Sequence, residues 1–175
     1  VLLKNESFYS YSSLLGTSVT MKFDWEKEEV TLTYLDSELI LSMEDFRIWL
    51  AYTDLLLSPI LPLGTLVELD RELLPEELVS EMEKAKVPFM AMIMGRRLLS
   101  DPDDREYIDY LASIYPYGLR LDVDPLFIPS YLISRVIQEG YSDSLDQTYV
   151  DQQYRRDYFQ HNILSMTHSI EGGDR

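Results

Sequence analysis

The residues of this chain that could carry out chemistry are few and far apart. Two histidines, His161 and His168, lie seven positions apart near the carboxyl end, so both could face the same side of a continuing helix. Such a pair can bind a metal ion, but a histidine near a helix end usually complements the negative end of the helix dipole. We therefore expect no metal site at these residues.

A short acidic segment has the composition of a calcium-binding loop. It reads Asp101-Pro102-Asp103-Asp104-Arg105-Glu106. A calcium loop of the EF-hand type needs a glycine at its sixth position and a glutamate at its twelfth, and this segment has neither. A basic residue also stands in its middle. We expect a solvated turn here rather than a cation site.

No pattern in the sequence predicts an enzyme. The chain contains no Gly-x-Ser-x-Gly turn, phosphate-binding glycine loop, dinucleotide fingerprint or His-Glu-x-x-His motif. Three carboxylates, Asp109, Asp122 and Asp124, could form an acid pair, but their spacing alone does not bring them together. The absence of cysteine removes disulfides, thiolate metal sites and cysteine nucleophiles. We expect no catalytic residue, no metal and no cofactor.

The chain is strongly acidic. Its 175 residues include 31 acidic and 15 basic side chains, which give a formal net charge of −16. A field of this sign repels nucleic acid and anionic lipid, so we expect binding to neither through a basic surface. The negative charge is compatible with a basic protein partner. It is equally compatible with a protein whose acidity only keeps it soluble. The sequence leaves both interpretations open.

The sequence predicts neither membrane insertion nor export. Its most apolar window, residues 51–67, is interrupted by Asp54, two prolines and Gly64, so it does not predict a spanning helix. The first six residues lack the charged-then-apolar pattern of a signal peptide. These features predict a cytoplasmic protein, although the removal of a leader ahead of residue 1 stays open.

The first 60 residues predict a hairpin and a helix. Apolar residues alternate with polar ones over residues 19–25 and again over 30–34, which is the period of half-buried strands. A third strand is expected at 38–41. Ser42 is placed to cap the helix that follows, with Asp45 at the position of the capping-box carboxylate.

The helix predicted at residues 43–57 is apolar on two sides. One side carries Phe46, Leu50, Thr53 and Leu57, and the nearly opposite side carries Ile48, Tyr52 and Leu55. A helix of this kind is either enclosed by its own chain or contacts a partner. We therefore take Ile48, Tyr52 and Leu55 as candidate partner-binding residues.

Strands and helices alternate irregularly in the remainder of the chain. We expect strands at 61–67, 87–94, 107–114 and 135–139, a helix beginning at Pro75, and the longest helix at about 143–164. This order predicts an α+β fold with a mainly antiparallel sheet, packed helices and a long carboxyl-terminal helix. Residues 1–60 form either an annex or a separate domain, 61–168 the main domain, and 169–175 a disordered tail.

The last helix carries two apolar faces. At about 100° per residue, one face holds Leu145, Tyr149, Phe159 and Ile163, and the other holds Val150, Tyr154 and Tyr158. One face can pack on the sheet, while the other needs a second surface, supplied by the amino-terminal hairpin or by another protein. Tyrosine suits a protein interface because it buries a large area and keeps a polar group. We take Val150, Tyr154 and Tyr158 as candidate partner-binding residues.

A series of short motifs spans residues 61–141. They are Leu61-Pro62-Leu63-Gly64-Thr65-Leu66-Val67, Met92-Ile93-Met94-Gly95-Arg96, residues 107–110, Tyr115-Pro116-Tyr117-Gly118, and Ile133 and Val136 followed by Gly140-Tyr141. In this order they resemble the small domain of unknown function encoded beside LXG toxins in type VIIb secretion loci of Gram-positive bacteria. Residues 71–87 depart from that family as a helical insertion, and residues 1–60 have no counterpart in it.

The resemblance implies an interaction protein rather than an enzyme. It points to a non-catalytic cytoplasmic accessory factor, or chaperone, that binds a cognate LXG toxin for type VIIb secretion. The alternative is an immunity protein that neutralises the toxin's carboxyl-terminal domain, for which acidity would suit a basic nuclease. The two differ in which end of the toxin is bound. The partner's identity and the oligomeric state, including a homo-oligomer, stay open.

Overall fold

The computed structural model describes residues 5–14, 16–101 and 103–168. The chain divides into two compact units, and the boundary lies between Ala51 and Tyr52, inside helix α1 (Met43–Leu57). The tail expected at residues 169–175 lies outside the described residues, as does Pro102 of the acidic segment. The division drawn from the sequence after residue 60 stays a prediction.

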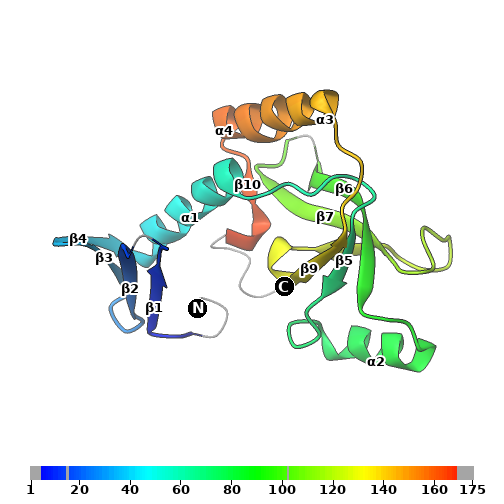
Figure 1. Ribbon diagram of the computed structural model, residues 1–175, viewed down its shortest axis with the longest axis horizontal. Helices are drawn as coiled ribbons and strands as arrows, with labels where there is room; N and C mark the ends of the chain where they lie inside the picture. The colour runs from blue at the N-terminus through cyan, green and yellow to red at the C-terminus, as the bar shows by residue number, and fades with distance from the viewer. Residues whose placement is uncertain (1–4, 15, 102, 169–175) are drawn as a thin grey trace. The chain divides into compact units, whose positions relative to one another are not determined.

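The first unit contains an antiparallel four-stranded sheet in the order β1-β2-β3-β4 (Figure 1). Its strands are β1 (Phe8–Ser12), β2 (Ser18–Asp24), β3 (Glu29–Tyr34) and β4 (Ser37–Ser42). The predicted hairpin and third strand are confirmed. The sequence analysis did not predict β1, because all five of its residues are exposed and no buried side imposes an alternating pattern.

Helix α1 begins at the predicted cap. The Ser42 hydroxyl oxygen accepts a hydrogen bond from the backbone N–H of Asp45 at 3.0 Å. The Asp45 carboxylate accepts a hydrogen bond from the Ser42 hydroxyl at 2.8 Å. In a capping box this carboxylate would instead accept from the backbone N–H of Ser42. Phe46 then packs against Phe23 and Val30, which form the core of the first unit.

The second unit is built on a six-stranded sheet in the order β10-β7-β6-β5-β9, with β8 also paired to β7. Its strands are β5 (Leu66–Leu69), β6 (Met90–Leu99), β7 (Glu106–Ile114), β8 (Leu126–Ile128), β9 (Ile133–Gln138) and β10 (Leu164–Ser165). Every pairing is antiparallel except that of β10 with β7. Together with α2 (Glu76–Ala85) and a carboxyl-terminal helix, this sheet confirms the predicted α+β fold.

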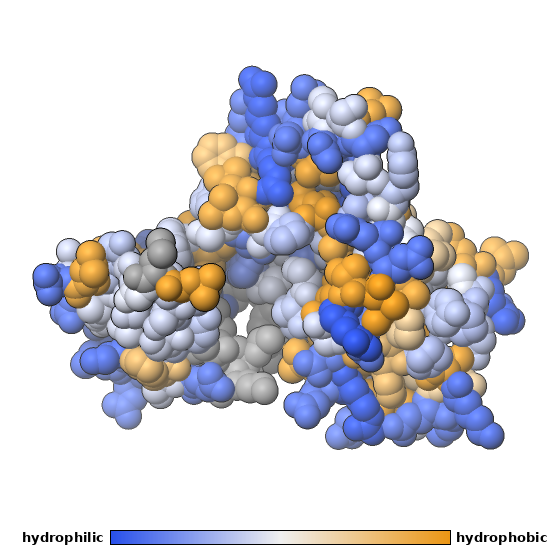
Figure 2. Space-filling model, viewed as in Figure 1, coloured by the Kyte–Doolittle hydropathy of each residue, from blue (hydrophilic) through white to orange (hydrophobic). Residues whose placement is uncertain are grey.

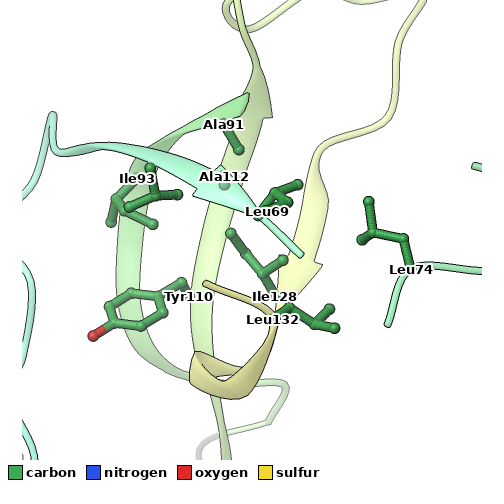
Figure 3. Close-up of a cluster of buried hydrophobic side chains, with 9 residues drawn as sticks. Leu69, Leu74, Ala91, Ile93, Tyr110, Ala112, Ile128 and Leu132 are labelled. Carbon is green, nitrogen blue, oxygen red and sulfur yellow. The ribbon is translucent and has the colours of Figure 1, made fainter. Parts of the chain in front are cut away.

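The main core of the second unit lies on one side of this sheet. Figure 3 shows side chains from β5, β6, β7, β8 and the short helix η2 (Ser130–Leu132) converging on one another. The cluster is made of Val67, Leu69, Leu74, Ala91, Ile93, Tyr110, Ala112, Ile128 and Leu132. Helix α2 covers part of it with Leu78 and Val79.

The carboxyl-terminal helix is present, but it is not a regular α-helix. It consists of α3 (Ser144–Tyr149), a π-helical segment η3 (Val150–Asp157) and α4 (Tyr158–His161). Asp143 caps its start by accepting hydrogen bonds from the N–H groups of Leu145 and Asp146, both at 3.0 Å. A π-turn is wider than an α-turn, so residues five apart come close to each other in this segment.

Candidate functional site

Two consecutive arginines in β6 are buried. Arg96 is 6% exposed and Arg97 is 5% exposed. Consecutive residues of a regular strand point to opposite faces. Here Arg97 has a left-handed backbone with φ of 46°, and the pairing of β6 with β7 is irregular between Ile93 and Gly95. This local distortion lets the two guanidinium groups reach different parts of the carboxyl-terminal helix.

Arg96 holds the first turn of α3. Its Nη2 donates to Oδ1 of Asp146 at 2.7 Å and its Nη1 donates to Oδ2 at 3.3 Å, a two-point contact that fixes orientation. The Ser142 hydroxyl donates to the same carboxylate at 2.9 Å. The hydrogen bond from Arg96 is the main cause that lowers the pKa of Asp146. The Gly-Arg motif therefore has a structural role, because it anchors the helix to β6.

Arg97 joins the end of α1 to the π-helical segment. Its Nη1 donates to the carbonyl oxygen of Tyr154 at 2.5 Å, and its Nη2 donates to that of Leu55 at 3.0 Å. The guanidinium lies 5.0 Å from the ring centroid of Tyr107. Burial lowers the pKa of Arg97, but an arginine stays charged over the physiological range.

Arg155 completes the cap at the end of α1. It donates through Nη1 to the carbonyl oxygen of Leu56 and through Nη2 to that of Ser58 at 3.1 Å. The last carbonyl groups of a helix have no intrahelical partner, and α1 has no basic residue in its own last turn. Two arginines from β6 and η3 therefore satisfy carbonyls that the sequence of α1 leaves open.

Tyrosines fill the space between β7 and the carboxyl-terminal helix. Leu55 and Tyr107 are 0% and 1% exposed and cluster with Tyr158 and Ile163. The ring centroids of Tyr107 and Tyr158 are 5.5 Å apart, and the Tyr158 hydroxyl donates to the carbonyl oxygen of Arg97 at 2.8 Å. Tyr154 packs against this cluster, and burial is the main cause that raises its pKa to about 12.

The structure distributes the six candidate partner-binding residues over different environments. Leu55 and Tyr158 are buried, Tyr52, Val150 and Tyr154 are partly buried, and Ile48 is 41% exposed in the first unit. Tyr52 also packs on the tyrosine cluster, and its hydroxyl donates to Oδ1 of Asn162 at 2.8 Å. The helix face that carries Tyr154 and Tyr158 is therefore covered by the chain itself, and the presence of a partner at these six residues stays a prediction.

A small cavity lies beside Arg97 and is too small for a substrate. Its volume is about 10 Å³, and Asp54, Tyr107 and Asp109 are among the residues that line it. This is the space of about one water molecule. Asp109 accepts hydrogen bonds from the N–H and hydroxyl of Ser130, each at 2.7 Å, and from the hydroxyl of Ser165 at 2.6 Å. Its carboxylate is thus occupied in joining β7 to neighbouring elements.

Asp122 and the two histidines have partners of their own. Asp122 forms an ion pair with Arg120 at 2.5 Å. His161 Nδ1 lies 2.8 Å from the carbonyl oxygen of Asp157, whereas His168 Nε2 lies 3.9 Å from the Asp54 carboxylate. Within the described residues, no three His, Cys, Asp or Glu side chains gather as metal ligands.

The acidic segment at 101–106 uses its carboxylates to close its own turn. The Asp104 carboxylate accepts from the backbone N–H of Asp101 at 2.8 Å, and the Asp101 carboxylate accepts from that of Asp103 at 3.0 Å. This agrees with the solvated turn expected there. In the part of the chain that the structure describes, no helix is long and apolar enough to cross a bilayer.

Exposed apolar side chains gather around the start of α3. Tyr141 is 82% exposed, Leu145 is 77% exposed and Tyr149 is 50% exposed, and the last two lie one turn apart on α3. Leu63 is 49% exposed, and its backbone lies against Gly140, the residue before Tyr141. We call Leu63, Tyr141, Leu145 and Tyr149 the Tyr141 patch. Figure 2, in which tyrosine is coloured pale, shows a mostly hydrophilic surface along the carboxyl-terminal helix with small hydrophobic areas.

Replacing Gly140 with valine is expected to lower the free energy of unfolding by about 3 kcal/mol. A Cβ added at Gly140 would lie 2.1 Å from the carbonyl oxygen of Leu63 and 2.9 Å from the backbone nitrogen of Thr65, so the backbone must move. Urea denaturation measures the change. Tyr141→Val, at the exposed neighbouring position, is the control, with an expected change below about 0.5 kcal/mol. An unchanged midpoint for Gly140→Val would contradict this close approach.

Comparison with known families gives one result that covers much of the chain. The family model described as Domain of unknown function (DUF4176) matches residues 60–149, just over half of the 175 residues. The motif series at 61–141, the Arg96–Asp146 pair and the whole Tyr141 patch fall within this match. No curated protein and no solved structure matches the chain.

Proposed function

The chain belongs to the DUF4176 family, and from that premise we propose that it is a non-catalytic cytoplasmic accessory factor, or chaperone, that binds a cognate LXG toxin for type VIIb secretion. The observation that carries this proposal is the Tyr141 patch. It exposes apolar and aromatic side chains inside the family domain, at the end of the motif series whose resemblance points to such toxins.

The patch stands out because neighbouring motif residues have structural roles. Arg96 pairs with Asp146, and the Thr65 hydroxyl accepts a hydrogen bond from the N–H of Gly140 at 3.0 Å. Tyr141 has no comparable packing role, because it is 82% exposed and its hydroxyl makes only a long contact of 3.4 Å with Asp143. An aromatic side chain in this position is typical of an interface anchor.

Acidic residues flank the patch along the chain. Glu139, Asp143 and Asp151 are exposed near it along the chain. Apolar anchors flanked by charge match the usual anatomy of a protein interface, in which the centre supplies most of the affinity. The acidic residues would favour a basic partner and raise its association rate, most strongly at low salt. A toxin segment with an apolar centre and basic flanks fits this surface.

We expect the double change Tyr141→Ser and Leu145→Ser to weaken toxin binding at least about 30-fold, or about 2 kcal/mol. The test is co-purification of the chain with the toxin encoded in its own locus, followed by titration of toxin fragments by calorimetry. The variant should keep the wild-type melting temperature, because both side chains are mostly exposed.

The matched control is Leu119→Ser with Leu121→Ser. These leucines are 60% and 111% exposed in the same family domain, away from α3 in the sequence. Their replacement should leave binding unchanged. Wild-type affinity for the patch variant, or the failure of every toxin fragment to bind, would contradict the proposal.

A second candidate function, immunity, is favoured by one observation. The net charge of −16 would suit a protein that blocks a basic nuclease by occupying its substrate-binding surface. Binding to the toxin's carboxyl-terminal domain together with loss of toxin activity would identify an immunity protein. Binding to the rest of the toxin without inhibition would support the accessory role.

A further inference from the structure

Strand β4 forms a regular edge of the sheet in the first unit. Among the described residues it pairs only with β3, over six consecutive positions from Glu29↔Ser42 to Tyr34↔Ser37 without a shift in register. In an antiparallel ladder, alternate residues of an edge strand direct their N–H and C=O groups away from the partner. β4 therefore presents an uninterrupted row of hydrogen-bonding groups that a further strand could use.

The side chains of β4 are unusually apolar for such an edge. Leu39 is 54% exposed and Ile40 is 61% exposed, and they point to opposite faces of the strand. Natural proteins usually protect an open edge with bulges, proline or inward charges. The edge strand β9 shows such protection, because its pairing with β5 shifts register twice and Arg135 forms an ion pair with Glu68. β4 has neither a bulge nor a proline.

The charges next to β4 have one sign. Residues 34–46 contain Asp36, Glu38, Glu44 and Asp45 and no lysine or arginine. The first two lie near the start of the strand and the last two follow its end. Such a distribution favours a cationic segment and disfavours a second copy of this chain, which carries a net charge of −16.

We propose that β4 binds an extended segment of another protein, in which basic residues alternate with apolar ones, as an added strand of the sheet. Backbone hydrogen bonds to β4 hold the segment in place. Leu39 and Ile40 contact its apolar side chains, and Glu38 with its acidic neighbours attracts its basic ones. This surface lies outside residues 60–149, so the inference goes beyond the Tyr141 patch and does not depend on the toxin proposal.

The test uses the full chain and a fluorescein-labelled peptide of alternating lysine and valine. Fluorescence anisotropy should show saturable binding, and hydrogen exchange should slow at the β4 amides when the peptide is bound. Ile40→Lys should weaken binding at least about tenfold, because the added lysine repels the cationic peptide. The fold should tolerate the change, since lysine is common on edge strands. The melting temperature checks the fold, and Glu38→Lys serves as a second variant with the same expected loss.

Two controls separate strand addition from simple charge attraction. A peptide of alternating lysine and proline has the same charge but lacks half of the backbone donors, so it should bind at least about tenfold more weakly. Val136→Lys places the same charge on the protected edge strand β9 and should leave binding unchanged. Equal binding of the two peptides, or wild-type binding by both Ile40→Lys and Glu38→Lys, overturns the proposal. A dimer of the chain that Ile40→Lys abolishes also overturns it, because the occupant is then a second copy.

Discussion

Replacing Arg97 with methionine is expected to lower the free energy of unfolding by about 3–5 kcal/mol. The guanidinium is buried and donates to the carbonyl oxygens of Tyr154 and Leu55 at 2.5 and 3.0 Å. Methionine occupies similar space but leaves both carbonyls without this donor, and each unsatisfied buried group costs about 1–3 kcal/mol. Urea denaturation followed by circular dichroism measures the loss.

Two further variants show whether the charge or its geometry matters. Arg97→Lys keeps the charge but cannot donate in two fixed directions, so we expect most of the stability loss to remain. Arg156→Met removes an exposed arginine from the same helix and should change stability by less than about 0.5 kcal/mol. Wild-type stability in Arg97→Met would show that other groups satisfy the end of α1.

The elements with a strong local pattern could be predicted from the sequence. A few neighbouring residues are enough to determine these elements. Apolar residues alternate with polar ones from Val19 to Trp25, and a capping serine precedes α1, so β2, β3 and the α1 cap were predicted. Pro75 marked the start of α2 for the same reason. Short strands such as β8 and β10 depend on distant pairing and leave no such local pattern.

The buried arginines could not be predicted, although the motif series contains one of them. Arginine is rarely buried unless it is paired, and nothing in the neighbourhood of Arg96 reveals that its partner is Asp146. The carbonyl partners of Arg97 likewise come from α1 and η3. The contacts by which Arg96 and Arg97 anchor the carboxyl-terminal helix are therefore tertiary, and the periodicity of a single sequence cannot predict them.

The two predicted faces of the carboxyl-terminal helix differ in burial, but one contact between them was not predicted. At about 100° per residue, Tyr149 and Tyr154 fall on opposite faces, but their ring centroids are only 5.2 Å apart. The π-helical segment brings residues five apart into contact, and Tyr154 then contacts Tyr158 with a centroid separation of 5.7 Å. The tyrosines consequently form one row that leads from the exposed patch into the core.

The position of this row determines what a double change in it should do. Changing both Tyr154 and Tyr158 to serine is expected to lower the free energy of unfolding by at least about 4 kcal/mol, because large buried aromatics each contribute about 3–5 kcal/mol. Tyr158 is 7% exposed, and its removal also deprives the Arg97 carbonyl of its donor. A domain with a typical stability of about 5–15 kcal/mol would then be close to unfolding at room temperature.

Thermal denaturation of both double variants shows which tyrosines belong to the core and which to the interface. The variants compared are Tyr154→Ser with Tyr158→Ser and Tyr141→Ser with Leu145→Ser. The patch variant should melt like the wild type and lose toxin binding, whereas the Tyr154→Ser, Tyr158→Ser variant should melt at a much lower temperature. If the latter kept the wild-type melting temperature and lost only toxin binding, Tyr154 and Tyr158 would belong to the partner surface, as the sequence analysis expected. The packing of the helix over Tyr107 would then have to be opened for the partner to bind.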